Sequence, residues 1–171
     1  MGVPDRGVMK MPFRLQWTGT EELLRKMEKL PEKAEKIASE ALYEGAGVMA
    51  DAITQSVHSI QTEEFKYASG GKKRKPSPEE KAILESAKHG IAKFRKDGTS
   101  VQTSIGFENA GYAKLGDKEV PIPLIANSIN HGTSFMQKQP FLRKAFSQNK
   151  GKVLATIEAG IKKRENELDL D

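Results

Sequence analysis

An Asp-Gly pair between two alternating segments constrains the fold of this chain more than any other local feature. Residues 91–96 and 99–107 alternate apolar and polar side chains, and Asp97-Gly98 joins them. Asp-Gly favours a type I′ turn, whose twist matches a pair of antiparallel strands. A two-residue loop would place Phe94 opposite Val101, so that the apolar sides of both strands meet. The sequence therefore predicts a β-hairpin and, with it, an antiparallel sheet.

The longest helical pattern covers residues 31–58. Apolar residues recur there at steps of three and four, and Pro31 stands in the first turn, where proline is tolerated. Small residues in its middle, Gly45 and Gly47 among them, favour close packing of another element, although simple tolerance of glycine is the alternative. We therefore expect a long amphipathic helix at the centre of the domain.

The remaining elements follow from shorter patterns. Alternation predicts a strand at 13–17. Residues 108–121 are rich in turn residues, and we expect residues 123–130 to form a third strand. Caps and periodicity predict helices at 20–30, from Ser77 to about 89, and from Pro140 to 167. The expected fold is α+β, with a small antiparallel sheet packed against a long amphipathic helix and a C-terminal helix.

Composition limits the size of the core. The chain has 171 residues, of which 37% are hydrophobic, so we expect one domain over 1–171 with a thin core that a neighbouring subunit completes. A flexible N-terminus at about 1–11 and a basic loop or arm at about 61–77 complete this picture. No apolar stretch of about 18 residues suggests a membrane span.

The sequence offers little for catalysis. There is no cysteine, and neither HExxH, GxSxG nor a phosphate-binding GxxxxGK[ST] occurs. Three histidines, His58, His89 and His131, lie far apart along the chain. We therefore expect a protein that is not an enzyme and that binds no metal, cofactor or small-molecule substrate. A hydrolytic or toxin-like enzyme using His131 or His89 is an alternative hypothesis.

A basic cluster stands in the middle of the predicted arm and consists of Lys72, Lys73, Arg74 and Lys75. Such a cluster could contact DNA phosphates or a partner protein, and binding would then weaken with salt. The simpler interpretation is a solvated loop. With a formal net charge of +5, a small basic nucleic-acid-binding protein is the alternative to a structural role.

One motif resembles a known family. Residues 129–133 contain Gly132-Thr133, and residues 139–146 contain the run Pro140, Phe141, Leu142 and Arg143. This arrangement resembles the tail-component, or neck, family of siphophages and related prophages, whose members often carry a strand ending in Gly-Thr, a short loop and then Pro-Phe-Leu-Arg-Pro-Ala. Lys144 departs from the family's second proline, and 61–77 looks like an insertion. The six motif residues named above are a possible interface.

The resemblance implies a structural role in the virion. Members of that family are neck or tail-completion subunits that form rings at the head–tail junction, between head-completion and tail-terminator proteins. By similarity, this chain would form a homo-oligomeric ring, located in the host cytoplasm during assembly and in the neck of the virion afterwards. Genomic DNA would pass through the lumen and make nonspecific contacts there.

Overall fold

The protein has an α+β fold. The computed structural model describes residues 14–17, 31–64, 72–91, 94–97, 100–107 and 110–168. Its helices are α2 (Pro31–His58), α3 (Pro78–Ser86), α4 (Ile122–His131) and α5 (Phe141–Leu168). Its strands are β1 (Arg14–Trp17), β2 (Gly90–Ile91), β3 (Arg95–Asp97), β4 (Ser100–Gly106), β5 (Tyr112–Leu115) and β6 (Lys118–Pro121). The expected fold class is therefore confirmed.

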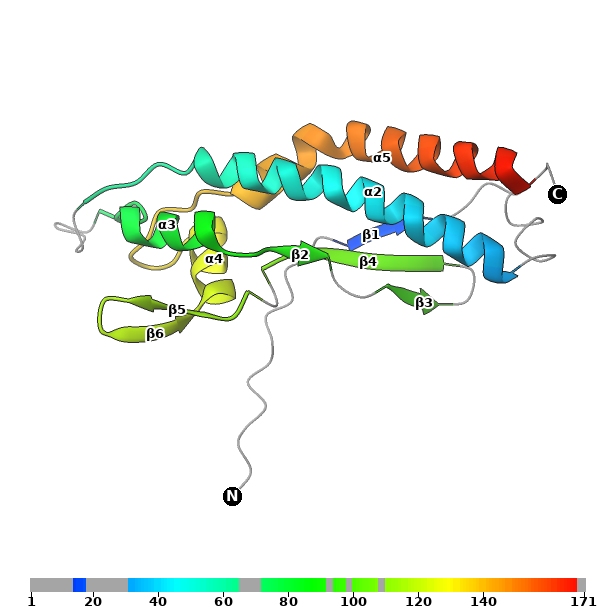
Figure 1. The fold of residues 1–171 in the computed structure, drawn as a ribbon. Helices are drawn as coiled ribbons and strands as arrows, with labels where there is room; N and C mark the ends of the chain where they lie inside the picture. The colour runs from blue at the N-terminus through cyan, green and yellow to red at the C-terminus, as the bar shows by residue number, and fades with distance from the viewer. Residues whose placement is uncertain are drawn as a thin grey trace, which may run out of the picture.

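Strand β4 is the centre of the main sheet, which is antiparallel throughout (Figure 1). It pairs with β1 along one edge and with β2 and β3 along the other. The predicted hairpin is present, but its register is wrong: Lys96, not Phe94, lies opposite Val101. The two registers differ by two residues and place the same side chains on the same face, so the apolar pattern alone does not distinguish them.

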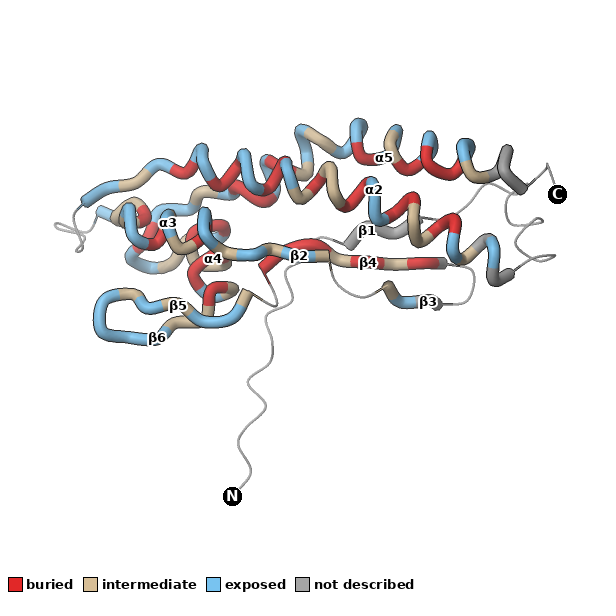
Figure 2. Tube along the Cα trace, in the orientation of Figure 1, coloured by how far each residue is buried: buried red, intermediate tan, exposed pale blue. Residues whose placement is uncertain are grey.

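Helix α2 is the central layer of the molecule, with β4 on one side and α5 on another (Figures 1 and 2). The predicted bounds, 31–58, are confirmed. Val101, Ile105 and Phe107 of the β4 segment are buried in the core. Gly45 is a site of close approach, because a Cβ there would lie 2.5 Å from Ile157 of α5.

Helix α5 runs unbroken through its 28 residues and is therefore about 42 Å long. Its buried stripe packs against α2 and includes Val153, Ile157 and Ile161. Near its far end, Arg164 donates to Glu40 and Glu44 of α2, both at 2.7 Å. These ion pairs fix the antiparallel alignment of the two helices.

The prediction of a third strand at 123–130 is wrong, because residues 122–131 form helix α4. Ile122, Ile125, Ala126 and Ile129 are buried, at steps of three and four, whereas Leu124 is 47% exposed. The same short apolar run fits a buried strand and one side of a helix, and packing against α3 and α5 decides for the helix.

The turn-rich segment 108–121 contains a second hairpin that its sequence pattern did not indicate. Strands β5 and β6 pair in a two-stranded sheet around Gly116 and Asp117. Gly116 has φ +62°, which suits the first central position of a two-residue hairpin loop. Its amide donates to Glu79 of α3 at 3.2 Å, which ties the tip of the hairpin to that helix.

Some predictions lie outside the described residues, namely the helix at 20–30, the N-terminus at 1–11 and residues 65–71 of the arm. Within the described part, no helix combines the length and apolar character that crossing a bilayer would require. Helix α3 begins after Ser77 as predicted but ends at Ser86 rather than near residue 89.

Candidate interaction site at the junction of two loops

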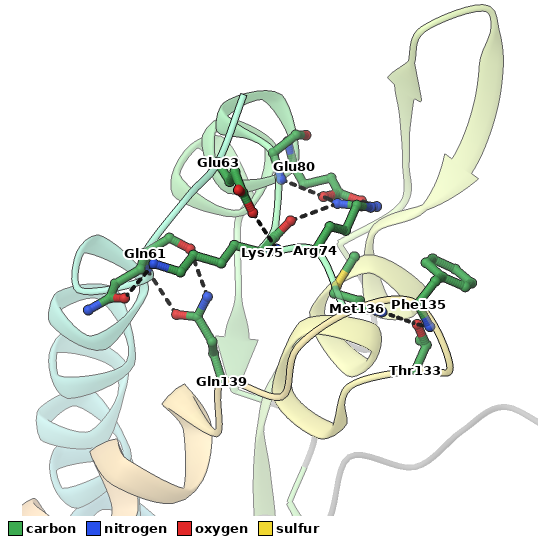
Figure 3. Close-up of polar contacts among 10 residues, drawn as sticks. Gln61, Glu63, Arg74, Lys75, Glu80, Thr133, Phe135, Met136 and Gln139 are labelled. Carbon is green, nitrogen blue, oxygen red and sulfur yellow. Dashed lines mark hydrogen bonds and ion pairs between the residues drawn. The ribbon is translucent and has the colours of Figure 1, made fainter. Parts of the chain in front are cut away.

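The basic cluster and the family motif, which are far apart in sequence, meet in the structure (Figure 3). The amide of Arg74 donates to the carbonyl of Phe135 at 2.8 Å, and the amide of Gln137 donates to the carbonyl of Arg74 at 2.8 Å. Arg74 thereby forms a parallel bridge with Met136, whose side chain is buried. We call this place the junction, which consists of residues 61–64, 72–77 and 132–141.

Arg74 is held there by a nearly buried ion pair. Its guanidinium donates to both carboxylate oxygens of Glu80 at 2.8 Å, and the two side chains are only 14% and 6% exposed. The amide of Ser77 donates to the same carboxylate at 2.7 Å, which completes the capping box of α3. The expectation that this part of the arm is an exposed loop is therefore wrong for Arg74 and for the buried Pro76.

Opposing influences act on the pKa of Glu80. Burial is the largest and raises it, but hydrogen bonds from Arg74 and Ser77, with the positive charge of Arg74, together outweigh burial and lower the pKa below 4.5. The pKa of Arg74 is raised, chiefly by its hydrogen bonds to Glu80. Both shifts favour the charged forms, so the pair stays ionised at neutral pH.

Gln61 and Gln139 join the two loops at a second point. The backbone N–H of Gln61 donates to Gln139 Oε1 at 2.9 Å, and Gln139 Nε2 donates to the backbone carbonyl of Gln61 at 2.7 Å. Lys75 Nζ donates to Gln61 Oε1 at 3.1 Å (Figure 3). Of the basic cluster, Arg74 and Lys75 thus have intramolecular partners, whereas Lys72 and Lys73 are exposed.

Gly132 and Thr133 shape the turn that leads into this loop. Gly132 has φ +75°, and a Cβ there would lie 3.0 Å from the Lys138 amide nitrogen, so glycine is required. Thr133 Oγ1 accepts from the amides of Met136 at 3.0 Å and Phe135 at 3.3 Å. Both residues therefore stabilise the conformation of the loop.

The Pro-Phe-Leu-Arg part of the motif divides into a buried half and an exposed half. Phe141 and Leu142 are 3% and 1% exposed and belong to the core, so neither contacts a partner in this conformation. The Leu142 amide donates to the buried Asn130 at 3.1 Å, which anchors the start of α5. Pro140 and Arg143 are exposed and remain available to a partner.

An open pocket of about 370 Å³ lies where the end of α2 meets the start of α5. Its exposed apolar lining residue is Pro140, above the nearly buried Ile60 and Phe141, while Gln139, Lys138 and Lys144 contribute polar atoms. Both lysines are exposed, and within the described chain neither ammonium group has a hydrogen-bond or ion-pair partner. The lining contains two positive charges and no acidic residue.

The three histidines lie in different settings. His58 contacts Glu85 at 2.9 Å, His89 contacts Thr54 and the Ala50 carbonyl, and His131 contacts Asn130. Among the described residues, no group of three or more His, Asp or Glu side chains is arranged to hold a metal ion. Within the described part of the chain, each of these histidines contacts other residues and no two of them contact each other.

Sequence patterns did not indicate Glu80, Gln61 or Gln139 as parts of this junction. The capping box at Ser77 places Glu80 at a fixed position, and this was the one available signal.

Comparison of the chain with protein-family models, with curated proteins and with solved structures yields no match.

Proposed function

We propose that this chain is a structural protein of a tailed phage or prophage, a ring-forming neck or tail-completion subunit at the head–tail junction. The observation that carries the proposal is the charge of the exposed surface of α5. That surface presents six basic side chains between residues 141 and 164 and a single acidic one, Glu158. The basic residues are Arg143, Lys144, Lys150, Lys152, Lys162 and Lys163. A basic surface of this kind tolerates DNA that passes through a lumen.

Helix α2 carries neither lysine nor arginine from residue 40 to residue 58. Two of its three acidic side chains there, Glu40 and Glu44, are paired with Arg164 of α5 in the same molecule, which leaves the exposed Asp51 for a partner. A ring is built from head-to-tail contacts, in which two different surfaces of identical subunits meet. Surfaces of opposite sign on different elements favour contacts of this kind over contacts between identical patches.

Exposed apolar side chains add possible anchors for such contacts. They occur on separate elements and are Tyr43, Tyr112, Leu124, Phe135 and Leu154, exposed by 43–69%. Single exposed apolar residues are ordinary on a monomer. Their aromatic members are nevertheless of the type that is enriched at interfaces between proteins.

The decisive experiment asks whether purified particles of the source virus contain this polypeptide. We expect mass spectrometry to find it in complete particles, and deletion of its coding region to leave filled heads and separate tails. Adding the purified chain to such an extract should restore joined particles. Infectious particles that lack the polypeptide would contradict the proposal.

A small nucleic-acid-binding protein is the second candidate, because the same basic surface of α5 favours it. A DNA titration of the isolated chain at two salt concentrations separates the two. Tight binding that falls steeply with salt supports the second candidate, and Lys150→Glu/Lys152→Glu should then reduce the steepness by about 0.9 per lost phosphate contact. Weak binding by the isolated subunit favours the neck proposal.

A further inference from the structure

The pocket beside the junction has the chemistry of a receptor for an acidic, partly apolar segment. Its rim carries Lys138 and Lys144, and its wall includes Ile60 and Pro140. Its volume of about 370 Å³ is at the lower end of the range of about 300–1,000 Å³ for ligand pockets. It can therefore accept a few side chains of an extended segment.

The chain itself contains a segment with the complementary chemistry. Residues 165–171 read Glu-Asn-Glu-Leu-Asp-Leu-Asp and contain four acidic residues and no basic one. In residues 168–171, leucine and aspartate alternate, so an extended backbone would place the leucines on one side and the carboxylates on the other. We call residues 165–171 the acidic segment.

The acidic segment cannot reach the pocket of its own molecule. The pocket lies at the first turn of α5, whereas the segment begins in the last turn of the same 28-residue helix, about 36 Å away (Figure 1). Beyond Leu168, residues 169–171 extend by about 11 Å at most. Occupation of the pocket by this segment therefore requires a second copy of the chain.

We propose that the acidic segment of one copy docks into the Lys138–Lys144 pocket of the next copy. The carboxylates pair with the two lysines, and a leucine packs on the exposed Pro140. Each subunit then offers one pocket and one segment, which is the head-to-tail arrangement that produces rings or filaments. The inference rests on the self-association in the proposed function, and it adds the contact that holds neighbours together.

A peptide of residues 165–171 tests the contact directly. With a fluorescent label, it should bind a full-length chain whose own segment carries Asp169→Lys/Asp171→Lys, with binding followed by anisotropy. A control peptide keeps the leucines but replaces each acidic residue by its amide and should bind at least about tenfold more weakly, equivalent to about 1.4 kcal/mol. The same loss is expected for the labelled acidic peptide on the pocket variant Lys138→Glu/Lys144→Glu. Equal binding of both peptides, or no binding at all, would overturn the inference.

Charge exchange tests the contact between whole chains. The pocket variant alone, and a segment variant Asp169→Lys/Asp171→Lys alone, should lose self-association in sedimentation, and mixing the two should restore it. Lys88→Glu/Lys118→Glu is the control, because it makes the same charge change at two exposed lysines that lie outside both α5 and the pocket lining. Rings that persist in both variants would refute the docking contact and leave the neck proposal intact. Absence of the polypeptide from particles would refute the neck proposal, whatever the peptide does.

Discussion

Replacing Arg74 by methionine tests whether the junction depends on the ion pair with Glu80. Methionine keeps much of the side-chain volume but removes the guanidinium that donates to both carboxylate oxygens. The carboxylate of Glu80 is 6% exposed and would keep the amide of Ser77 as a donor. The variant therefore leaves a buried charge with one hydrogen bond in place of three.

The expected cost follows from that geometry. Removing one partner of a buried ion pair costs about 3–5 kcal/mol. The remaining hydrogen bond from Ser77 and the 14% exposure of the Arg74 site lower this range, so we expect about 2–3 kcal/mol. Urea unfolding at neutral pH should show a midpoint about 1 M lower than that of the parent chain.

The pH dependence provides an independent check. The pKa of Glu80 is lowered in the folded protein, so its contribution to stability is present above 4.5, its ordinary value, and is lost as pH falls through the folded pKa. The difference in unfolding free energy between the parent and Arg74→Met should therefore shrink as the pH falls from 7 to below 4.5. Without Arg74, burial raises the pKa of Glu80 and only the hydrogen bonds with Ser77 oppose it, so protonation relieves the buried charge.

Lys73→Met is the matched control, because Lys73 is exposed and next to Arg74. It should change stability by no more than about 0.5 kcal/mol. The reasoning would be refuted if the two methionine variants had equal stability at pH 7, or if the difference between Arg74→Met and the parent did not depend on pH.

Three further predictions concern the packing of the fold. Gly45→Ala should destabilise by about 1–3 kcal/mol, because its Cβ would meet a buried isoleucine of α5 at 2.5 Å, whereas Gly47→Ala, with no neighbour within 4 Å, should stabilise α2 by about 1 kcal/mol in thermal or urea unfolding. Gly132→Ala should lose more stability than Gly111→Ala in the same assay, since both have positive φ but only Gly132 also meets backbone atoms, and equal losses would contradict this. Phe141→Asp should abolish folding by circular dichroism, because it buries an unpaired charge at a site that is 3% exposed; a stable variant defective only in assembly would make this a contact residue.

Helices that begin with residues favoured at helix starts were predictable from the sequence. Pro31 marks the start of α2, and regular apolar spacing continues to its end. Ser77, Pro78 and Glu80 specify the start of α3 through a capping box that the structure contains. These local interactions need no knowledge of the rest of the chain, because each joins residues within one turn.

Elements that depend on distant partners were not predictable. The run 122–130 is too short for its periodicity to separate a strand from a helix, and α4 forms because its apolar stripe packs on α3 and α5. The register of β3 against β4 could not follow from the apolar pattern, since a two-residue shift keeps each side chain on its face. Turn chemistry alone favoured the wrong one of two equivalent registers.

The basic cluster shows why charge counted along a sequence overstates the charge that a partner can reach. Arg74 forms an ion pair with Glu80, six positions away, and Lys75 donates to Gln61. Of the four residues of the cluster, only Lys72 and Lys73 are exposed to solvent without such a partner. A partner or DNA that binds this cluster must therefore respond to charge reversal at Lys72 and Lys73 without any change in stability. Reversal at Arg74 would instead place two carboxylates together in the core and unfold the junction, so loss of binding in that variant would say nothing about contact.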